Sequence, residues 1–337
     1  QIANGIPQEV VDELIKFGGA FPEGHLPNAY GHAGSFTPID GEVLKLVTQK
    51  MCLDAGVQLV LGTYALGPIM EGDRVAGVRI ANKSGEGEIR AGIVIDSSGD
   101  ADIAAQAGAP FHLGDEQGKM MSITLVFRLG EVNLEKHIQF VKANPQQFMM
   151  GEDPYIEKTR EEIAAGLKSH KDFPLVTGYY NAVKEAQSRG ELHSNRQRMI
   201  FSITPIHGVV TMNSTSMLGY SGVDNDDLTA VALEGREQIF QVRDFFKKYA
   251  PGFEDSYVLD SAAALGVRET RRIIGEEILT QEDCIEGRKG PRDIGRGAYC
   301  LDLHQPSGII EHRHIKNGES YGIPYGVMVP QKVESCL

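Results

Sequence analysis

The chain has 337 residues, 41% of them hydrophobic and 23% charged, a composition typical of an ordinary globular protein that excludes disordered and fibrous classes. Its formal net charge of −13, from 33 basic and 46 acidic residues, argues against nucleic acid as a partner. No apolar run approaches the roughly 18 residues that a membrane span needs, so no membrane partner is expected. The length favours two domains over one.

Four cysteines lie far apart in the sequence and form no C-x-x-C pair. This spacing predicts neither a metal site nor a disulfide framework, and a reducing cytoplasm is the default location. The chain begins at Gln1 without methionine and ends at Leu337 within a segment typical of the approach to a strand. We therefore expect both ends to be cut, and the sequence leaves the oligomeric state unknown.

The N-terminal part predicts an α/β layer with a small β-meander. Its helices rest on apolar residues at helical spacing, and its buried strands on short continuous apolar runs. The predicted elements are a helix over 7–17, a helix from its N-cap Asp40 to Gly56, a buried strand over 57–62, a hairpin of strands 74–80 and 86–90, and a buried strand over 92–96.

After Gly108 the pattern changes to separate runs of strands and helices, which is typical of an α+β domain. A long amphipathic helix is the strongest signal in this part. The predicted elements are a strand over 122–129, helices over 133–141, 155–165 and 181–188, paired strands over 200–211 and 215–219, and a helix over 228–249.

The most informative segment is residues 91–108, where an apolar run leads into Ser98, Gly99 and Asp100 and then into a helix of small residues. Glycine allows a close backbone approach, and the acidic side chain can accept hydrogen bonds from a turn or a ribose. The alternative is a helix cap without a ligand, since Ser and Asp are favoured there in any case.

Three arginines stand close together at Arg268, Arg271 and Arg272. On a helix they share a face and can present several donors to one anion, such as a substrate carboxylate. The alternative is a surface network with Glu269 and other nearby glutamates.

Asp302 and His304 alternate within the run YCLDLH, so a strand points both side chains to one face. A carboxylate beside an imidazole suits proton transfer, whereas a lone histidine is more often structural. His312 and His314 have the spacing of a metal pair, but no third ligand is evident.

Several of these segments together resemble one family. The helix after Asp40, the runs VQLVLGT, RVAGVRI and VIDSSGDADIAAQAGA, and then GVRETRRIIGEEILTQED, YCLDLHQPSG and YGIPYGVMVP resemble the FAD-dependent oxidoreductases of the glutathione-reductase-like flavoprotein superfamily, in particular the group related to fumarate reductase and succinate dehydrogenase flavoproteins. The likeness covers most of the chain.

The resemblance implies an α/β plus α+β fold, in which a partial Rossmann-like FAD-binding layer with a β-meander carries an inserted mixed-sheet substrate domain. The implied divisions are a partial FAD-binding domain over 1–115, a substrate domain over 116–260 and a return segment over 261–337. The family's glycine-rich G-x-G-x-x-G fingerprint occurs nowhere in this chain and is expected before Gln1. The final flavin-binding segment is expected after Leu337, so the chain is expected to be an internal fragment.

The resemblance also implies FAD as cofactor and hydride transfer to or from a small-molecule substrate. It assigns cofactor contacts to Ser98, Gly99 and Asp100, and to the backbone of Ala65 at the adenine edge. The expected catalytic residues are Arg268, which would hold substrate or flavin charge, and His304 with Asp302, which would handle a proton.

The residues leave two alternative functions open. One is a cofactor-free domain or interaction module without turnover, which predicts no affinity for FAD. The other is an unrelated α/β protein that binds a small ligand at the turn of Ser98, Gly99 and Asp100. It predicts that residues 266–325 lie far from that turn.

Overall fold

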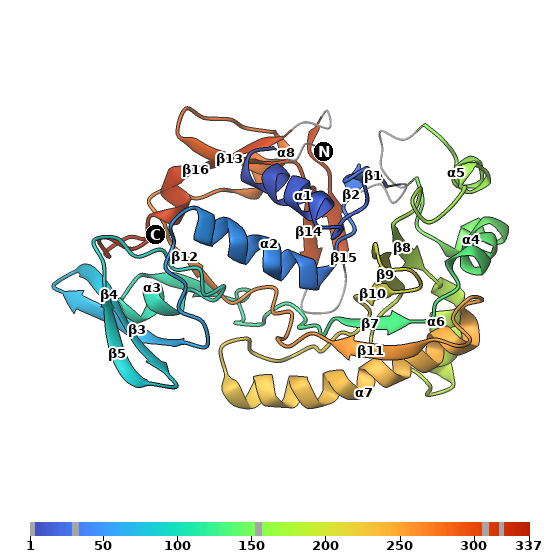
Figure 1. The fold of residues 1–337 in the computed structure, drawn as a ribbon, viewed down its shortest axis with the longest axis horizontal. Helices are drawn as coiled ribbons and strands as arrows, with labels where there is room; N and C mark the ends of the chain where they lie inside the picture. Colours follow the sequence, from blue (N-terminus) through green and yellow to red (C-terminus); the bar gives the residue numbers. More distant parts are fainter. Residues whose placement is uncertain (1–3, 29–33, 152–156, 305–309, 317–319) are drawn as a thin grey trace. The chain divides into compact units, whose positions relative to one another are not determined.

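The computed structural model describes residues 4–28, 34–151, 157–304, 310–316 and 320–337, which form a mixed α/β protein with several antiparallel sheets (Figure 1). The chain divides into two compact units. Unit 1 comprises Gln1–Val57, Ser122–Leu218 and Asp226–Val267, and unit 2 comprises Gln58–Met121, Gly219–Asn225 and Arg268–Leu337. Each unit is thus assembled from separate stretches of sequence, and the expected boundaries near residues 115 and 260 stay a prediction.

Unit 1 is built around a five-stranded sheet in the order β11-β7-β10-β9-β8, in which every neighbouring pair is antiparallel. Its helices are α1 Ile6–Lys16, α2 Gly41–Asp54, α4 Leu134–Ala143, α5 Arg160–Gly166, α6 Tyr180–Ser188 and α7 Asn225–Tyr249, with a 3-10 turn at Pro145–Gln147. Its strands are β1 Leu26–Pro27, β2 Ser35–Phe36, β7 Phe127–Gly130, β8 Leu175–Gly178, β9 Met199–Ile203, β10 Val210–Met212 and β11 Tyr257–Ser261.

The core of unit 1 is aromatic. Phe148, Phe201, Phe246 and Phe253 are fully buried. The ring of Phe201 meets those of Phe246 and Phe253 edge to face, with centroids 5.9 and 5.3 Å apart. Such contacts add to the free energy gained by burying the rings themselves. The helix α7 contributes to this core because its apolar residues recur every three or four positions.

The helices α1 and α2 form a smaller cluster in unit 1 around Leu14, Ala20 and Val47. Asp40 caps α2, as the sequence predicts, by accepting a hydrogen bond of 2.9 Å from the Glu42 N–H. Gly19 lies so close to Val43 that a Cβ atom there would collide with it. The close approach of these helices therefore depends on a glycine at this position.

Unit 2 contains a three-stranded meander and three two-stranded ribbons, β6-β12, β13-β16 and β14-β15. The meander confirms the predicted hairpin and extends it by one strand. The strands are β3 Tyr64–Glu71, β4 Arg74–Asn82, β5 Gly85–Arg90, β6 Phe111–Leu113, β12 Arg271–Ile273, β13 Asp293–Gly297, β14 Leu301–His304, β15 Ile310–Arg313 and β16 Tyr321–Pro324. The helices are α3 Asp102–Gln106 and α8 Gln281–Ile285, with a 3-10 turn at Tyr325–Met328.

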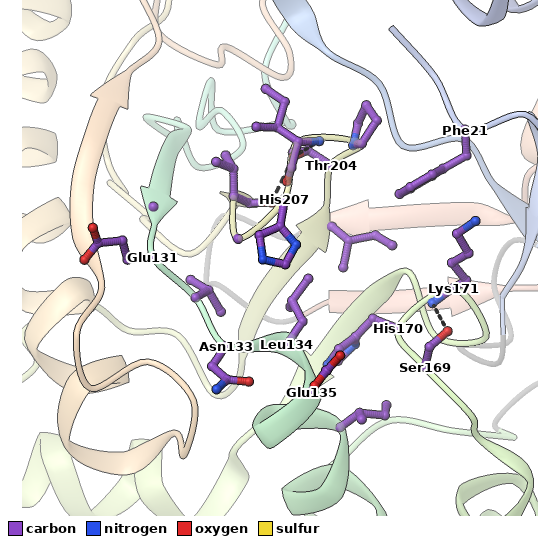
Figure 2. A pocket seen from close by; sticks show the side chains of 18 of the residues that line it. Phe21, Glu131, Asn133, Leu134, Glu135, Ser169, His170, Lys171, Thr204 and His207 are labelled. Carbon is purple, nitrogen blue, oxygen red and sulfur yellow. Dashed lines mark hydrogen bonds between the residues drawn. The ribbon is translucent and has the colours of Figure 1, made fainter. Parts of the chain in front are cut away.

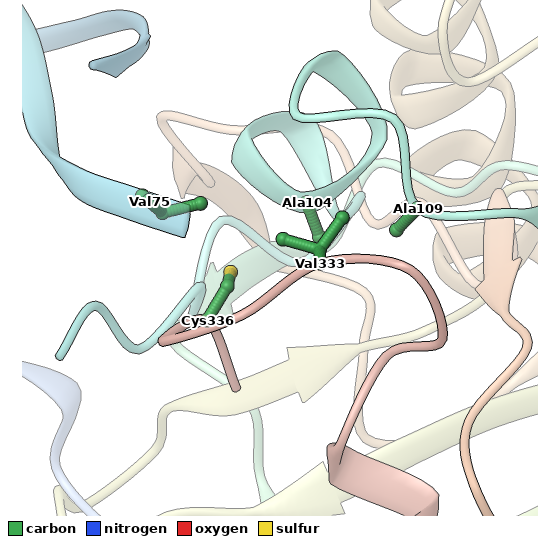
Figure 3. Close-up of a cluster of buried hydrophobic side chains, with 5 residues drawn as sticks. All are labelled: Val75, Ala104, Ala109, Val333 and Cys336. Carbon is green, nitrogen blue, oxygen red and sulfur yellow. The ribbon is translucent and has the colours of Figure 1, made fainter. Parts of the chain in front are cut away.

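The core of unit 2 is built from small side chains. Figure 3 shows Val75 of β4, Ala104 of α3, Ala109, and Val333 and Cys336 near the end of the chain gathered into one buried cluster. Small side chains let these backbone segments approach one another closely.

Two predicted buried strands are absent from the described structure. Residues 57–62 form no strand, and Leu61 is 76% exposed. Within residues 92–96 only Val94 makes a bridge, to Cys336, while Ile95 is 70% exposed. An apolar run sets a preference for strand, but a strand forms only where a neighbouring segment pairs with its backbone.

The strand predictions in the middle region are shifted. Regular pairing of the first strand begins at Phe127, whereas Ile123 makes an isolated bridge to Met217. The paired strands of this region are β9 and β10, which both lie within residues 199–212, and residues 215–219 form no strand. The turn between β9 and β10 was thus placed too late. The helix predicted over 155–165 begins in the structure at Arg160 after a capping box at Thr159, and residues 152–156 lie outside the described part.

Among the described helices, none combines the length and apolar character that crossing a membrane demands.

Candidate functional site

Asp96 organises the turn between the apolar run at residues 92–96 and α3, a role that was not predicted from the sequence. Its carboxylate accepts hydrogen bonds from the N–H groups of Ser98, Ile103 and Ala104 at 2.9 to 3.0 Å. Partial burial favours the neutral form of Asp96, but these hydrogen bonds outweigh it and hold the pKa of the carboxyl below its usual value. Asp96 therefore satisfies two backbone N–H groups in the first turn of α3, whose N-cap residue is Ala101.

The three predicted cofactor residues of this turn differ in what they contact. Ser98 Oγ accepts a hydrogen bond of 2.9 Å from the Asp102 N–H, so it supports the helix start. Gly99 is exposed, has a φ of +89°, and would bring a Cβ atom near nothing within 4 Å. Its backbone is consequently open to a ligand, in a conformation that favours glycine.

Asp100 connects the turn to β12. Its Oδ1 accepts a hydrogen bond of 2.7 Å from Thr270 Oγ1, and its carbonyl oxygen accepts one of 2.8 Å from Arg271 Nη1. Arg271 also forms an ion pair with Asp102 at 2.8 Å. The prediction that residues 266–325 lie far from this turn is therefore wrong, and with it the hypothesis of an unrelated ligand-binding protein loses its support.

The predicted helix carrying three arginines is wrong as well. Arg271 and Arg272 lie in the strand β12, and Arg268 precedes it outside any helix. Strand geometry sends neighbouring side chains to opposite faces. Accordingly, Arg271 bonds Asp100 while Arg272 donates to the Gly114 carbonyl oxygen at 2.6 Å.

Ala65, the predicted adenine contact, is exposed on β3 opposite Ile80. Two residues further along, Gly67 approaches Gln106 of α3 so closely that a Cβ atom there would lie 2.6 Å from Gln106 Oε1. Ala65 thus lies on β3, which packs directly on α3, the helix that follows the turn.

Arg268 and Asp302, two of the three predicted catalytic residues, interact electrostatically within unit 2. Part of Arg268 is exposed, yet loss of hydration around its guanidinium is the largest influence on it and lowers its pKa from the usual value. The negative charge of Asp302 acts in the opposite direction and raises this pKa. Arg268 is therefore a partly dehydrated cation within electrostatic range of a carboxylate, and perturbed groups of this kind cluster at functional sites.

Asp302 contacts an imidazole that was not assigned a catalytic role from the sequence. The ribbon of β14 and β15 pairs Asp302 with His312, and His312 Nε2 lies 3.1 Å from Asp302 Oδ1. The two side chains are only 12% and 29% exposed. The predicted partner His304 ends β14, and its side chain lies outside the described structure. Only cross-strand register reveals His312, since ten positions separate it from Asp302.

Unit 1 contains a cavity of about 1270 Å³. Figure 2 shows side chains from the start of α4, from the loop at residues 168–171 and from the turn after β9 converging on it. Its buried wall includes apolar Val132, Ile138 and Val209, and its rim carries exposed Glu131, Lys168 and other charged side chains. None of these residues was predicted from the sequence to form a site.

His170 on the wall of this cavity contacts a second buried histidine, His137, which in turn contacts Tyr179. No sequence pattern marks these three residues as functional, because His137 lies on an apolar helix face and the other two are far away in the chain. Within the described residues, no three His, Cys, Asp or Glu side chains are grouped to hold a metal ion.

Comparison with known families gives one match over the whole chain. The sequence model of a family described as FAD dependent oxidoreductase matches residues 1–337. No curated protein matched.

Among solved structures, the chain is similar to p-nitrophenol 4-monooxygenase PnpA from Pseudomonas putida DLL-E4, with 10% identity, a TM-score of 0.44 and coverage of 80% of this chain and 57% of that one. A geranylgeranyl bacteriochlorophyll reductase-like protein from Thermoplasma acidophilum matches with 15% identity, a TM-score of 0.39 and coverage of 72% and 50%. The flavin-dependent monooxygenase PieE, in complex with FAD and substrate, matches with 13% identity, a TM-score of 0.37 and coverage of 74% and 34%. The chain thus spans about half the length of the first two proteins and a third of the last.

Proposed function

Because this chain belongs to the family of FAD-dependent oxidoreductases, whose sequence model matches all of residues 1–337, we propose that the protein containing it binds FAD and transfers a hydride between the flavin and a small organic molecule. The family match over the entire chain is the observation that carries this proposal. Bound FAD supplies the two-electron chemistry, and the protein supplies binding, orientation and electrostatics.

The turn before α3 fits a part of the cofactor. Gly99 leaves the outer side of the backbone open, while Asp96 and Arg271 fix the turn from the inner side. A rigid turn with an open glycine lets a ligand reach backbone groups without displacing a side chain. Ser98, Gly99, Asp100 and the backbone of Ala65 are the contacts that we propose on this chain, and the glycine-rich fingerprint is not in its sequence.

The late segment of unit 2 supplies the charged groups of the proposal. Arg268 would hold a substrate carboxylate or stabilise negative charge on the ring system of the cofactor. Asp302 would orient an imidazole and balance its positive charge. That imidazole would hold the proton that accompanies hydride transfer. We keep His304 as the predicted imidazole and add His312, which lies beside Asp302.

The four cysteines are free thiols in the structure. This supports, as part of the same proposal, a reducing location such as the cytoplasm.

The test is FAD binding by the 337-residue chain and by two glycine variants. Gly99→Ala places a side chain on the open turn, and Gly85→Ala is the matched control. Gly85 also has a positive φ, of +108°, and open space around it, but it begins β5. Both substitutions therefore impose similar backbone strain. Bound flavin is measured by absorbance after removal of free FAD, and dissociation constants by flavin fluorescence.

We expect Gly99→Ala to weaken FAD binding by about tenfold, equivalent to about 1.4 kcal/mol, and Gly85→Ala to leave it unchanged. Equal affinities for both variants would remove the turn from the cofactor site. A chain that folds but retains no flavin at any FAD concentration would contradict the proposal for this chain.

A further inference from the structure

Three titratable side chains form a continuous buried array in unit 1. His137 is 0% exposed, His170 3% and Tyr179 1%. His137 Nδ1 lies 2.9 Å from His170 Nε2, and His137 Nε2 contacts the Tyr179 hydroxyl. Phe148, Phe201 and Phe253 present ring edges around His137, with centroids 5.3 to 6.2 Å away.

One backbone carbonyl sets the direction of the hydrogen bonds. His170 Nδ1 faces the Phe173 carbonyl oxygen at 3.4 Å, and a carbonyl oxygen can only accept, so Nδ1 must carry the proton. His170 Nε2 is then the acceptor for the His137 Nδ1–H, and His137 Nε2 is the acceptor for the Tyr179 O–H. With both histidines neutral, every polar atom of the array has a partner.

An additional proton is unfavourable at both acceptor positions of this array. On His170 Nε2 it would set two N–H donors face to face across 2.9 Å, and on His137 Nε2 it would make the Tyr179 oxygen the acceptor and deprive the hydroxyl proton of the acceptor that it has in the neutral array. Either proton therefore removes an acceptor that the neutral array uses, and it leaves a charge within an aromatic core.

The charged side chains on α4 and in the loop 168–173 pair with other groups or are exposed to solvent. On α4 Lys136 pairs with Glu254, and Lys142 donates to the Leu167 carbonyl oxygen. In the loop 168–173 Lys171 pairs with Glu23, and Asp172 accepts from the backbone N–H groups of Lys168 and Ser169. Glu135 and Lys168 are exposed on the cavity rim. Among the described contacts, none places a carboxylate on either ring to offset a proton.

We propose that the His137–His170 pair is an acid-sensitive latch on the wall of the unit 1 cavity, and that uptake of one proton by the pair releases the loop 168–173 from α4. The loop carries Lys168, Ser169, His170 and Lys171 into the cavity lining (Figure 2). Release of the latch therefore changes the shape and charge of the cavity as the pH falls.

The direction of the pH effect follows from burial. Burial lowers the pKa of His170 to about 4, and burial together with the neighbouring His170 lowers the pKa of His137 well below its usual value. An exposed histidine in the opened state takes up a proton near pH 6.5. The closed state is therefore fully favoured above pH 6.5. Its stability relative to the opened state decreases as the pH falls towards 4. For His170 alone, the equilibrium constant for opening rises about 30-fold between pH 7.5 and pH 5.

The experiment is hydrogen exchange of the full chain at pH 7.5 and pH 5, followed by mass spectrometry and corrected for intrinsic exchange rates. We expect exchange in α4 and the loop 168–173 to accelerate by about 30-fold relative to pH 7.5, without a matching rise in α2 of the same unit. No acceleration, or an equal acceleration in α2, would overturn the latch.

Two variants isolate the histidine pair. His170→Gln keeps an acceptor and a donor but does not titrate, so exchange in α4 should lose the roughly 30-fold part of its pH dependence that His170 contributes. His207→Gln removes an exposed imidazole from the rim of the same cavity and should behave as wild type. If both variants retain the wild-type pH dependence, the proposal is wrong. Should His170→Gln fail to fold, the comparison of wild-type segments still decides the question.

Discussion

The two units of this protein place histidine in opposite surroundings. In unit 1 His137 and His170 are enclosed by aromatic rings, and their described hydrogen-bond partners are neutral. In unit 2 His312 lies 3.1 Å from the carboxylate of Asp302, which also interacts with the Arg268 guanidinium. The same side chain is thus a neutral packing element in one unit and a member of a charged cluster in the other.

The difference shows how the surroundings of a titratable group decide its use. Burial without a counter-charge penalises the protonated imidazole, so the pair in unit 1 stabilises the fold and responds to acid. A carboxylate and a guanidinium at partial exposure can keep charges close to solvent and to a ligand, which suits binding and proton transfer. We therefore expect substitutions in unit 1 to affect mainly stability and those in unit 2 mainly ligand binding.

The largest expected effect is that of His137→Phe. The ring is replaced at similar volume, but the Tyr179 hydroxyl and His170 Nε2 each lose their buried partner. We expect the free energy of unfolding, measured by urea denaturation at pH 7.5, to fall by about 3 kcal/mol. The control is His112→Phe at an exposed position of β6, which should change it by less than about 0.5 kcal/mol. Similar values for both would mean that the array contributes nothing to stability.

An intermediate effect is expected for Arg271→Gln. This change removes the hydrogen bond to the Asp100 carbonyl oxygen and the ion pair with Asp102, at a side chain that is 20% exposed. Unfolding free energy should fall by about 1 kcal/mol, and FAD affinity should fall as the turn loosens. Arg189→Gln breaks an exposed ion pair with Glu185 and serves as the control, with both quantities unchanged. Loss of stability with intact FAD affinity would separate the turn from the cofactor.

The smallest effect on stability is expected for Asp302→Asn. The carboxylate is 29% exposed, so its interactions with His312 and Arg268 are screened by water and contribute less than about 1 kcal/mol. Urea denaturation checks this value. A loss as large as that of His137→Phe would show that the cluster in unit 2 is also structural, and the contrast between the units would fail.

The sequence was a good guide wherever structure depends on neighbouring residues. Asp40 was identified as the cap of α2, the hairpin of β4 and β5 was found, and α7 was predicted nearly to its ends. Helical spacing, capping and turn residues act over a few positions, so they are legible in a single sequence. The family was equally accessible, since the motifs that carry the resemblance lie in contiguous segments that the family model also matches.

The predictions that were wrong share a different cause. The run at residues 57–62 was predicted to be a buried strand, and Arg271 was placed on a helix, because the local pattern permits both. Whether a run becomes a strand depends on a pairing partner far away in the sequence, as between β12 and β6. The candidate site shows the same limit, because the role of Asp96 at α3 became visible only through its hydrogen bonds.

By itself, the sequence determined the class of the protein, its family, its principal helices and the turn of Ser98, Gly99 and Asp100. Tertiary structure alone decided which side chains meet. It set His312 beside Asp302, Arg271 beside Asp100 across 171 positions, and His170 against His137 across 33. The physical reason is that local preferences come from the backbone and nearest neighbours, whereas burial, charge pairing and strand register come from residues that only folding brings together.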